Sequence, residues 1–279
     1  MDSSRLSSIL RAIVAEDLGS GDVTTAFTPN RKITAAIIAQ EDGFVSGIKE
    51  VKTLFKLYGV CAESKFTDGN KINRGDKILL LIGDSSKILS LCRSALNILS
   101  RMSGITTLTR KYSDELSQVS PKTRVLATRK TTPLFRYFEK EAVKAGGGVS
   151  HRMGLYDMVM IKQEHLQMFK GDVKKAIATA KKEDPNYEIE IEVRGIQDAV
   201  KAAGCTPDVI MLDNMTPEKI KSTLRKLDEL GLRKRIKIEV SGGVGPNNFS
   251  QYAKLGVDYI SLGELTHSPK SLDFSLKIM

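Results

Sequence analysis

Short apolar runs alternate with helical segments through the second half of this chain, and this alternation restricts the possible folds more than any other feature. The runs are Val125–Thr128, Met158–Lys162, Tyr187–Val193, Asp208–Asp213, Ile236–Val240 and Tyr259–Leu262. Helix-forming stretches lie between most of them, for example Gly171–Lys182, Ile196–Ala203 and Pro217–Leu230. Strands separated by helices form parallel βαβ units. Since a complete eight-stranded barrel takes about 250 residues, the pattern predicts an open, incomplete parallel α/β barrel.

The first part of the chain has a different pattern. Apolar residues recur at helical spacing over residues 6–18, and Glu50–Tyr58 forms a second predicted helix. Glycine-containing turns separate three strand-like runs, which are Ile33–Ala39, Phe44–Ile48 and Lys77–Ile82. This part is expected to be an α+β unit with mostly antiparallel strands.

A long helix is expected from Ser85 to about Leu116, where apolar residues recur at steps of three and four. Ser103-Gly104 is a potential break in it. Arg93, Asn97 and Arg101 are spaced at four and form a polar stripe on this helix. The stripe is either a solvated face or part of a binding site.

The composition is that of a soluble globular protein, with 41% hydrophobic and 27% charged residues in a chain of 279. The sequence contains no apolar run near the roughly 20 residues that span a bilayer and no secretory signal, so a cytoplasmic protein is expected. Cys61, Cys92 and Cys205 are too dispersed for a disulfide framework or a zinc site. The net charge of +10 is spread along the chain and interleaved with acids, which favours small anionic ligands over nucleic acid.

Polar residues follow the predicted strands of the barrel. In parallel α/β folds, ligands bind at the carboxyl ends of the strands. These ends carry Arg129-Lys130, Lys162, Glu192, Asp213-Asn214, Ser241-Gly242-Gly243 and Gly263, and His151-Arg152 follow the glycines 146–148. Cations bind carboxylates and phosphates, glycine-rich loops bind phosphate, and paired carboxylates hold magnesium or stabilise positive charge. Together they predict a phosphorylated, metal-bound substrate beside a carboxylated one.

Each of these residues also has an ordinary structural interpretation. The cations could be solvated surface groups. Glu190 and Glu192 alternate with isoleucines and share one face of a strand, where exposed glutamates are common. Ser241–Gly243 could be a simple turn. The occurrence of all of them at strand ends favours a single site.

Several motifs in order resemble the quinolinate phosphoribosyltransferase family. They are EDLGSGDVTT at 16–25, RSALNILSRMSGI at 93–105, TRKTTP at 128–133, EKEAVKAGGG at 139–148, HRMGLYD at 151–157, IK at 161–162, EIEIEV at 188–193, LDN at 212–214, EVSGGV at 239–244 and GVDYISLGELTHS at 256–268. The resemblance covers nearly the whole chain.

This resemblance implies an N-terminal α/β sandwich domain, residues 1–116, joined by the tail 268–279, and an open α/β barrel over residues 117–267. It implies a homodimer in which each active site is completed by the partner subunit. The implied reaction joins quinolinate to 5-phosphoribosyl 1-pyrophosphate (PRPP) with Mg²⁺, releasing pyrophosphate and CO₂ and yielding nicotinate mononucleotide in NAD biosynthesis.

The resemblance also implies roles for individual residues. Four residues would hold the quinolinate carboxylates: Arg129, His151, Arg152 and Lys162. Arg93 would come from the partner subunit, and Lys130 and Thr131 would meet phosphate or pyrophosphate oxygens. Glu192 and Asp213 would lie near the ribose and contact the metal indirectly, through Mg-PRPP. The 5′-phosphate would be bound by Ser241, Gly242, Gly243 and Gly263, with His267 nearby. Lys130, Lys162, Glu192 and Asp213 are the expected catalytic residues.

The chain departs from the family pattern at Leu134, Gln163-Glu164, Arg194 and Glu264. Leu134 replaces a glycine, and Arg194 stands where polar or acidic residues are common. These departures bear on the substrate preference more than on the class of reaction. Two alternatives stay open beside this family: a related pyrophosphorylase on the same scaffold that uses another base, like the molybdenum-transport-associated proteins, or a basic nucleic-acid-binding protein.

Overall fold

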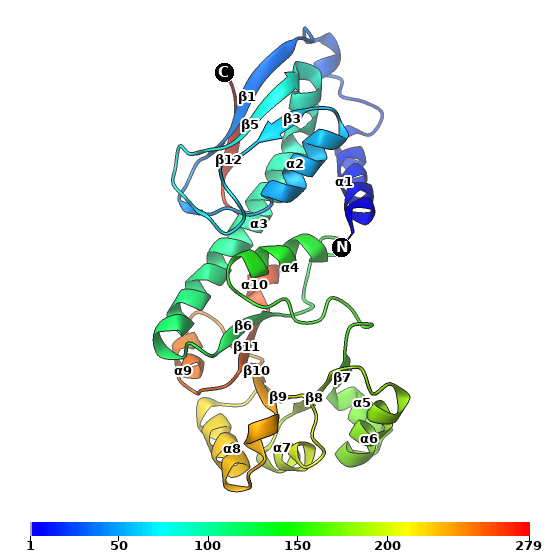
Figure 1. The fold of residues 1–279 in the computed structure, drawn as a ribbon, viewed down its shortest axis with the longest axis vertical. Coiled ribbons are helices and arrows are strands. Elements are labelled where there is room, and N and C mark those ends of the chain that lie inside the picture. The colour runs from blue at the N-terminus through cyan, green and yellow to red at the C-terminus, as the bar shows by residue number, and fades with distance from the viewer. Residues whose placement is uncertain (1) are drawn as a thin grey trace. The chain divides into compact units, whose positions relative to one another are not determined.

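The computed structural model describes residues 2–279, which form two compact units (Figure 1). Unit 1 comprises the residues up to Arg110 together with Thr132–Gly147 and Ser268–Met279. Unit 2 comprises Lys111–Thr131 and Gly148–His267. Each unit has its own sheet, and the mixed α/β class predicted from the sequence is confirmed.

Unit 1 contains an antiparallel four-stranded sheet in the order β12-β1-β5-β3. Its strands are β1 (Lys32–Ala39), β3 (Cys61–Glu63), β5 (Lys77–Asp84) and β12 (Phe274–Ile278). A small antiparallel pair is formed by β2 (Gly43–Phe44) and β4 (Lys71–Ile72). The helical elements of this unit are α1 (Ser3–Leu18), η1 (Thr25–Phe27), α2 (Ile48–Leu57), α4 (Arg136–Ala145) and most of α3 (Ser85–Val119). The antiparallel arrangement predicted for the first part of the chain is confirmed.

The predicted strand Phe44–Ile48 is wrong over most of its length. β2 ends at Phe44, and α2 already begins at Ile48. Gly47 lies between them with φ of 96°, a left-handed conformation that favours glycine and turns the chain from strand to helix.

The predicted break in α3 at Ser103-Gly104 is also wrong, because α3 continues through it. Gly104 serves a close packing contact instead. A Cβ atom at this position would lie 2.1 Å from the backbone oxygen of Lys270, in the segment that leads to β12. Nearby, the Leu272 amide donates to the Ser100 carbonyl at 3.1 Å. Glycine therefore lets the C-terminal segment pass directly over α3.

Unit 2 contains a parallel six-stranded sheet in the order β6-β11-β10-β9-β8-β7. The strands are β6 (Arg124–Ala127), β7 (Val159–Ile161), β8 (Ile189–Val193), β9 (Val209–Asp213), β10 (Lys237–Ser241) and β11 (Tyr259–Leu262). Helical elements along this part of the chain are α5 (Gln163–Met168), α6 (Val173–Glu183), α7 (Ile196–Ala203), α8 (Pro217–Glu229), η2 (Arg233–Arg235), α9 (Phe249–Ala253) and α10 (Glu264–His267). Within residues 2–279 no pairing joins β6 to β7, so the barrel is open.

The segment 132–147, which the sequence analysis assigned to the barrel, clusters with unit 1. Its helix α4 is bound to α3 by polar contacts. The buried Glu139 carboxylate accepts from Arg101 Nη2 at 2.8 Å, and Thr106 Oγ1 donates to the Ala142 carbonyl at 2.9 Å. The tail 268–279 lies in unit 1 as well, where it supplies β12.

Although α3, with 35 residues, is long enough to reach across a bilayer, neither it nor any other helix within residues 2–279 contains a sufficiently apolar stretch to do so.

Replacing Gly104 by Ala is expected to lower the free energy of unfolding by about 1–3 kcal/mol, because the added methyl group would collide with backbone that cannot move aside cheaply. Urea-induced unfolding of both proteins measures the effect. Gly204→Ala is the matched control, because its Cβ would meet its nearest neighbour at 3.5 Å, an ordinary contact. Equal stability changes in the two variants would refute the close contact at Gly104.

Candidate active site

The carboxyl ends of the unit 2 strands surround a cavity of about 430 Å³, called the strand-end cavity from here on. It draws residues from loops and strands that are far apart in the sequence. The predicted site residues that line it are Arg129, Lys130, His151, Arg152, Lys162, Glu192, Asp213, Ser241, Gly242 and Gly243. The structure thus brings most of the predicted strand-end residues to one place.

The remaining predicted residues lie elsewhere. Gly263 lies near the cavity wall, since a Cβ there would be 3.2 Å from Lys130 Cδ and 3.0 Å from His267 Nε2. Thr131 is half-buried, and its amide donates to the Arg129 carbonyl at 2.9 Å. Arg93 is exposed on α3 in unit 1.

The cationic side of the strand-end cavity is partly desolvated. Arg152 is buried, and burial together with the neighbouring Arg129 guanidinium lowers its pKa. The Nε atom of Arg129 is buried and has no hydrogen-bond partner. Because buried polar groups are nearly always paired, this N–H suits an anionic ligand.

Glu192 and Asp213 stand at the ends of the adjacent strands β8 and β9, and both are largely buried. Burial and the nearby Asp213 carboxylate raise the pKa of Glu192, while Lys162 and Arg194 oppose that shift. Lys162 Nζ lies 3.9 Å from Glu192 Oε2. Arg194 bridges the two acids, with Nε 3.0 Å from Asp213 Oδ2 and Nη2 3.5 Å from Glu192 Oε1.

A second acidic group lies deeper in the barrel, and the sequence analysis did not assign it to the site. His151 Nε2 lies 2.7 Å from Glu190 Oε2, and Ser261 Oγ donates to Glu239 Oε1 at 2.6 Å. Both carboxyl groups are fully buried, and each has one oxygen without a partner. Burial raises the pKa of Glu190 and of Glu239 to about 8 in each case.

The alternative that Glu190 and Glu192 are exposed strand residues is therefore wrong, since their exposed fractions are 0% and 7%. Ile189 and Ile191, which alternate with these glutamates, point to the other face, and α6 and α7 pack against β8. Both faces of β8 are buried, as all five of its residues are. The even spacing of Glu190 and Glu192, continued by Arg194 directly after the strand, was the available signal that they share a face.

His151 also has an unusual backbone, with φ of 49°. A residue that is not glycine rarely adopts this left-handed conformation, and such strain is found at functional sites. The hydrogen bond to Glu190 therefore holds both the ring and a strained main chain in place beside the strand-end cavity.

The glycine-rich loop after β10 fits a phosphate. Gly242 and Gly243 have φ of 87° and 66°, which favour glycine. A Cβ on Gly242 would also collide with the side chain of Asn214, which would have to move. Backbone amides in such turns form concave anion-binding sites.

Two departures from the family pattern have specific contacts in unit 2. Glu264 accepts a hydrogen bond from Tyr112 Oη, and Gln163 Nε2 donates to the Glu192 carbonyl at 3.0 Å. Glu164 is exposed. Leu134, in unit 1, is 93% exposed with φ of 63°, and nothing in the structure explains a leucine there.

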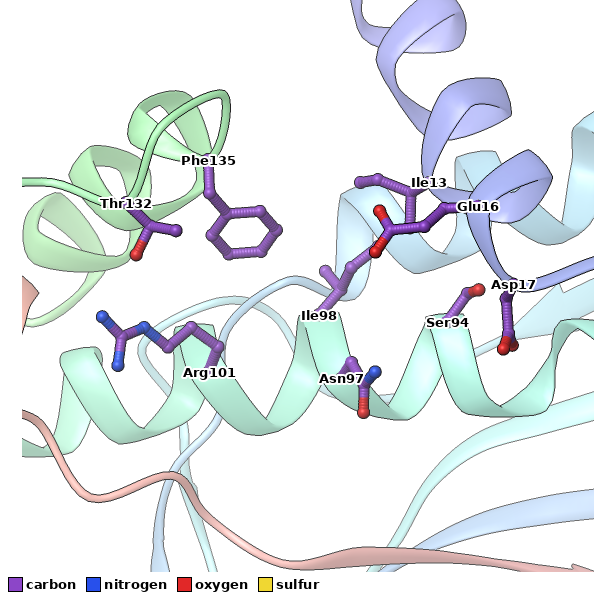
Figure 2. Close-up of a pocket in the computed structure, with 9 residues that line it drawn as sticks. All are labelled: Ile13, Glu16, Asp17, Ser94, Asn97, Ile98, Arg101, Thr132 and Phe135. Carbon is purple, nitrogen blue, oxygen red and sulfur yellow. The ribbon is translucent and has the colours of Figure 1, made fainter.

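Unit 1 has a cavity of its own, of about 470 Å³ (Figure 2). Figure 2 shows Glu16 and Asp17 of α1 beside α3, with Asn97 and Arg101 of the polar stripe along the same cavity. Arg101 is paired with Glu139, so this part of the stripe is not a solvated face. This cavity lacks the strand-end cations and glycines, and none of the predicted site residues lines it.

Two family models match the chain in sequence order: quinolinate phosphoribosyl transferase, N-terminal domain, over residues 22–103, and the C-terminal domain of the same family over residues 105–277. A probable nicotinate-nucleotide pyrophosphorylase (carboxylating) from Archaeoglobus fulgidus is 43% identical over 259 residues, covering 93% of this chain and 98% of the relative. A Bacillus subtilis protein of the same name is 36% identical over 282 residues, covering 100% and 95%.

Solved structures agree with these sequence matches. The crystal structure of NadC from Streptococcus pyogenes has a TM-score of 0.91 and 36% identity, and the match covers 100% of this chain and 99% of that one. A nicotinate-nucleotide pyrophosphorylase from Francisella tularensis has a TM-score of 0.89 and 32% identity, with 100% and 98% covered.

The buried carboxyl of Glu239 predicts a pH-dependent stability. Its folded-state pKa of about 8 exceeds its ordinary value of 4.5, so the folded protein binds more protons than the unfolded chain between these values. Stability should therefore fall as pH rises through this window, by up to about 1.4 kcal/mol per pH unit for one group. Carboxyl groups with a lowered pKa, such as Asp22 at about 2, change the stability only at pH values below this window.

Glu239→Gln keeps an acceptor for Ser261 and removes the ionisation, so its loss of stability from pH 5.5 to 7.5 should be smaller than that of the unmodified protein. Urea unfolding at several pH values measures both slopes. Glu183→Gln, an exposed change on α6, is the control and should leave the slope unchanged. Parallel pH profiles for the protein and Glu239→Gln would rule out this role of Glu239.

Proposed function

Because this chain belongs to the quinolinate phosphoribosyltransferase family, we propose that its strand-end cavity joins quinolinate to PRPP and releases pyrophosphate and CO₂, leaving nicotinate mononucleotide. The observation that carries this proposal is the composition of one cavity. Cations suited to a dicarboxylate lie in it beside a carboxylate pair and a glycine loop suited to phosphate. The relatives at 43% and 36% identity bear the corresponding name.

Quinolinate carries two carboxylates, and removing them from water requires several cations. Arg129, Arg152 and Lys162 supply three cationic side chains along one cavity. The buried, unpaired Nε of Arg129 gives one such contact without breaking another. His151, held by Glu190, adds a fixed ring at the same end of the cavity. In this role His151 binds the substrate, and no proton transfer by it is needed.

PRPP would occupy the other side of the cavity. Lys130 and Thr131 would contact pyrophosphate oxygens, and Ser241, Gly242, Gly243, Gly263 and His267 would surround the 5′-phosphate. The positive φ values of Gly242 and Gly243 leave their amides accessible to phosphate oxygens.

Glu192 and Asp213 would face a ribose bound between these two groups, and that ribose develops positive charge as pyrophosphate leaves. Two fixed carboxylates stabilise such a transition state electrostatically. After the ring nitrogen bonds to the ribose, it is positively charged. That charge stabilises the electron pair that stays on ring carbon 2 when CO₂ departs, and a proton from water then takes the place of the carboxylate at this carbon, so the loss of CO₂ itself needs no dedicated acid or base.

The residues also fit Mg²⁺ carried by PRPP. Two carboxylates on adjacent strands are hard oxygen donors of the kind that magnesium prefers, and both would reach the metal through the substrate. Bound magnesium would neutralise charge on the departing pyrophosphate. We further propose that the active protein is a homodimer, in which the partner subunit's Arg93 completes the quinolinate site.

The function is tested by supplying the purified protein with Mg²⁺, PRPP and either quinolinate or nicotinate. Nicotinate mononucleotide and CO₂ should form from quinolinate, with no product from nicotinate. Arg152→Ala should lower kcat/KM for quinolinate by about 100-fold or more, because it leaves a substrate carboxylate without its partner. Arg225→Ala, an exposed arginine on α8, should have no effect. Binding of PRPP without turnover of quinolinate would point to a different base.

The shared site is tested by mixing two inactive variants, Arg93→Ala and Lys162→Ala. If Arg93 acts in the partner's site, each mixed dimer has one intact site, and random exchange should restore about a quarter of full activity. Exchange is followed by native mass spectrometry. Mixed dimers without activity would place Arg93 outside the partner's site.

A further inference from the structure

Arg194 is the departure from the family pattern that lies closest to the predicted ribose and metal site. It directly follows β8 and lies on the same side of the strand as Glu190 and Glu192, since side chains alternate along a strand. Its guanidinium bridges Asp213 at 3.0 Å and Glu192 at 3.5 Å. The structure therefore shows a protein cation at the two carboxylates that the proposed reaction uses.

The two carboxylates need a counter-charge in the absence of a ligand. The exposed fractions of Glu192 and Asp213 are 7% and 9%, and their side chains stand on neighbouring strands. Like charges in a poorly solvated position repel strongly. Lys162 is too distant to neutralise both, at 3.9 Å from Glu192 alone. Arg194 is the group that contacts both acids among the ion pairs of residues 2–279.

The surroundings of the Arg194 side chain also allow it to leave the two carboxylates. Its side chain is 59% exposed, so it can turn into water without disturbing the core. Its backbone carbonyl accepts a hydrogen bond from Lys219 Nζ at 2.6 Å. Movement of this side chain would remove the guanidinium group that neutralises Glu192 and Asp213.

We propose that Arg194 is an internal counter-ion that occupies Glu192 and Asp213 in the free protein and is displaced from them when the metal complex of PRPP binds. A divalent cation alone would then have to compete with Arg194, whereas the cation bound to PRPP brings further contacts to the cavity. Arg194 thereby sets the order of binding and makes the metal enter with its substrate. This inference rests on the proposed function.

Binding of Mn²⁺ to the free protein tests the proposal, with the decrease of the free Mn²⁺ signal in electron paramagnetic resonance as the readout. Arg194→Ala should bind Mn²⁺ roughly tenfold more tightly than the unmodified protein, because the competing cation is gone. Adding Asp213→Asn to Arg194→Ala should abolish the gain. Arg225→Ala removes the same charge from an exposed position on α8 and should not alter Mn²⁺ binding.

Three results would overturn the proposal: no gain of Mn²⁺ affinity in Arg194→Ala, an equal gain in Arg225→Ala, or a gain that survives Asp213→Asn. A fourth test measures by calorimetry how tightly the protein binds PRPP in the presence of Mg²⁺. Arg194→Ala should bind this complex at least as tightly as the unmodified protein, and a severalfold loss would make Arg194 a substrate ligand instead. Neither measurement uses quinolinate or turnover, so a failure here is distinguishable from a failure of the proposed reaction.

Discussion

The neutralisation of charges at the ends of parallel strands is the constraint on which the rest of unit 2 depends. An isolated charge taken out of water costs several kcal/mol or more, and this sheet places four carboxyl groups on the same face of β8, β9 and β10. Arg194 pairs with Glu192 and Asp213, whereas burial raises the pKa of Glu190 and Glu239 to about 8, and one oxygen of each is held by a hydrogen bond with His151 or Ser261. The groups left unmatched, such as Arg129 Nε, are those suited to a ligand.

The sequence was sufficient for the parallel sheet because both faces of its strands are buried. A continuous apolar run bounded by turn residues is visible without knowledge of the fold; four of the six predicted runs contain the observed strands, and β6 and β10 are offset from theirs by one residue. The strand ends then followed, because parallel strands finish at one edge. The neighbours of residues deeper in the strands could not be predicted in this way. Glu239 lies inside its strand between apolar neighbours, and its contact with Ser261 of β11 is a consequence of strand order, which spacing along the chain does not reveal.

The errors in unit 1 have a similar origin. Gly104 looks like a helix breaker in the local sequence, yet its conformation is helical. A glycine is needed there because the backbone of Lys270, far along the sequence, passes too close for a side chain. The segment 132–147 looked like part of the barrel because it lies between two barrel strands. Its buried glutamate instead pairs with Arg101 of α3, a long-range contact that outweighs sequence order.

The strand order of unit 1 has a consequence for how the chain matures during synthesis. β12 pairs with β1 and covers one edge of the first sheet. A ribosome makes β1, β5 and β3 early and β12 only after every strand of the barrel. Until then β1 presents an open row of backbone donors and acceptors, the kind of edge at which nascent chains associate. Release of the C-terminal segment from the ribosomal tunnel is therefore the event that closes this edge, and it makes the N-terminal unit the last to be completed.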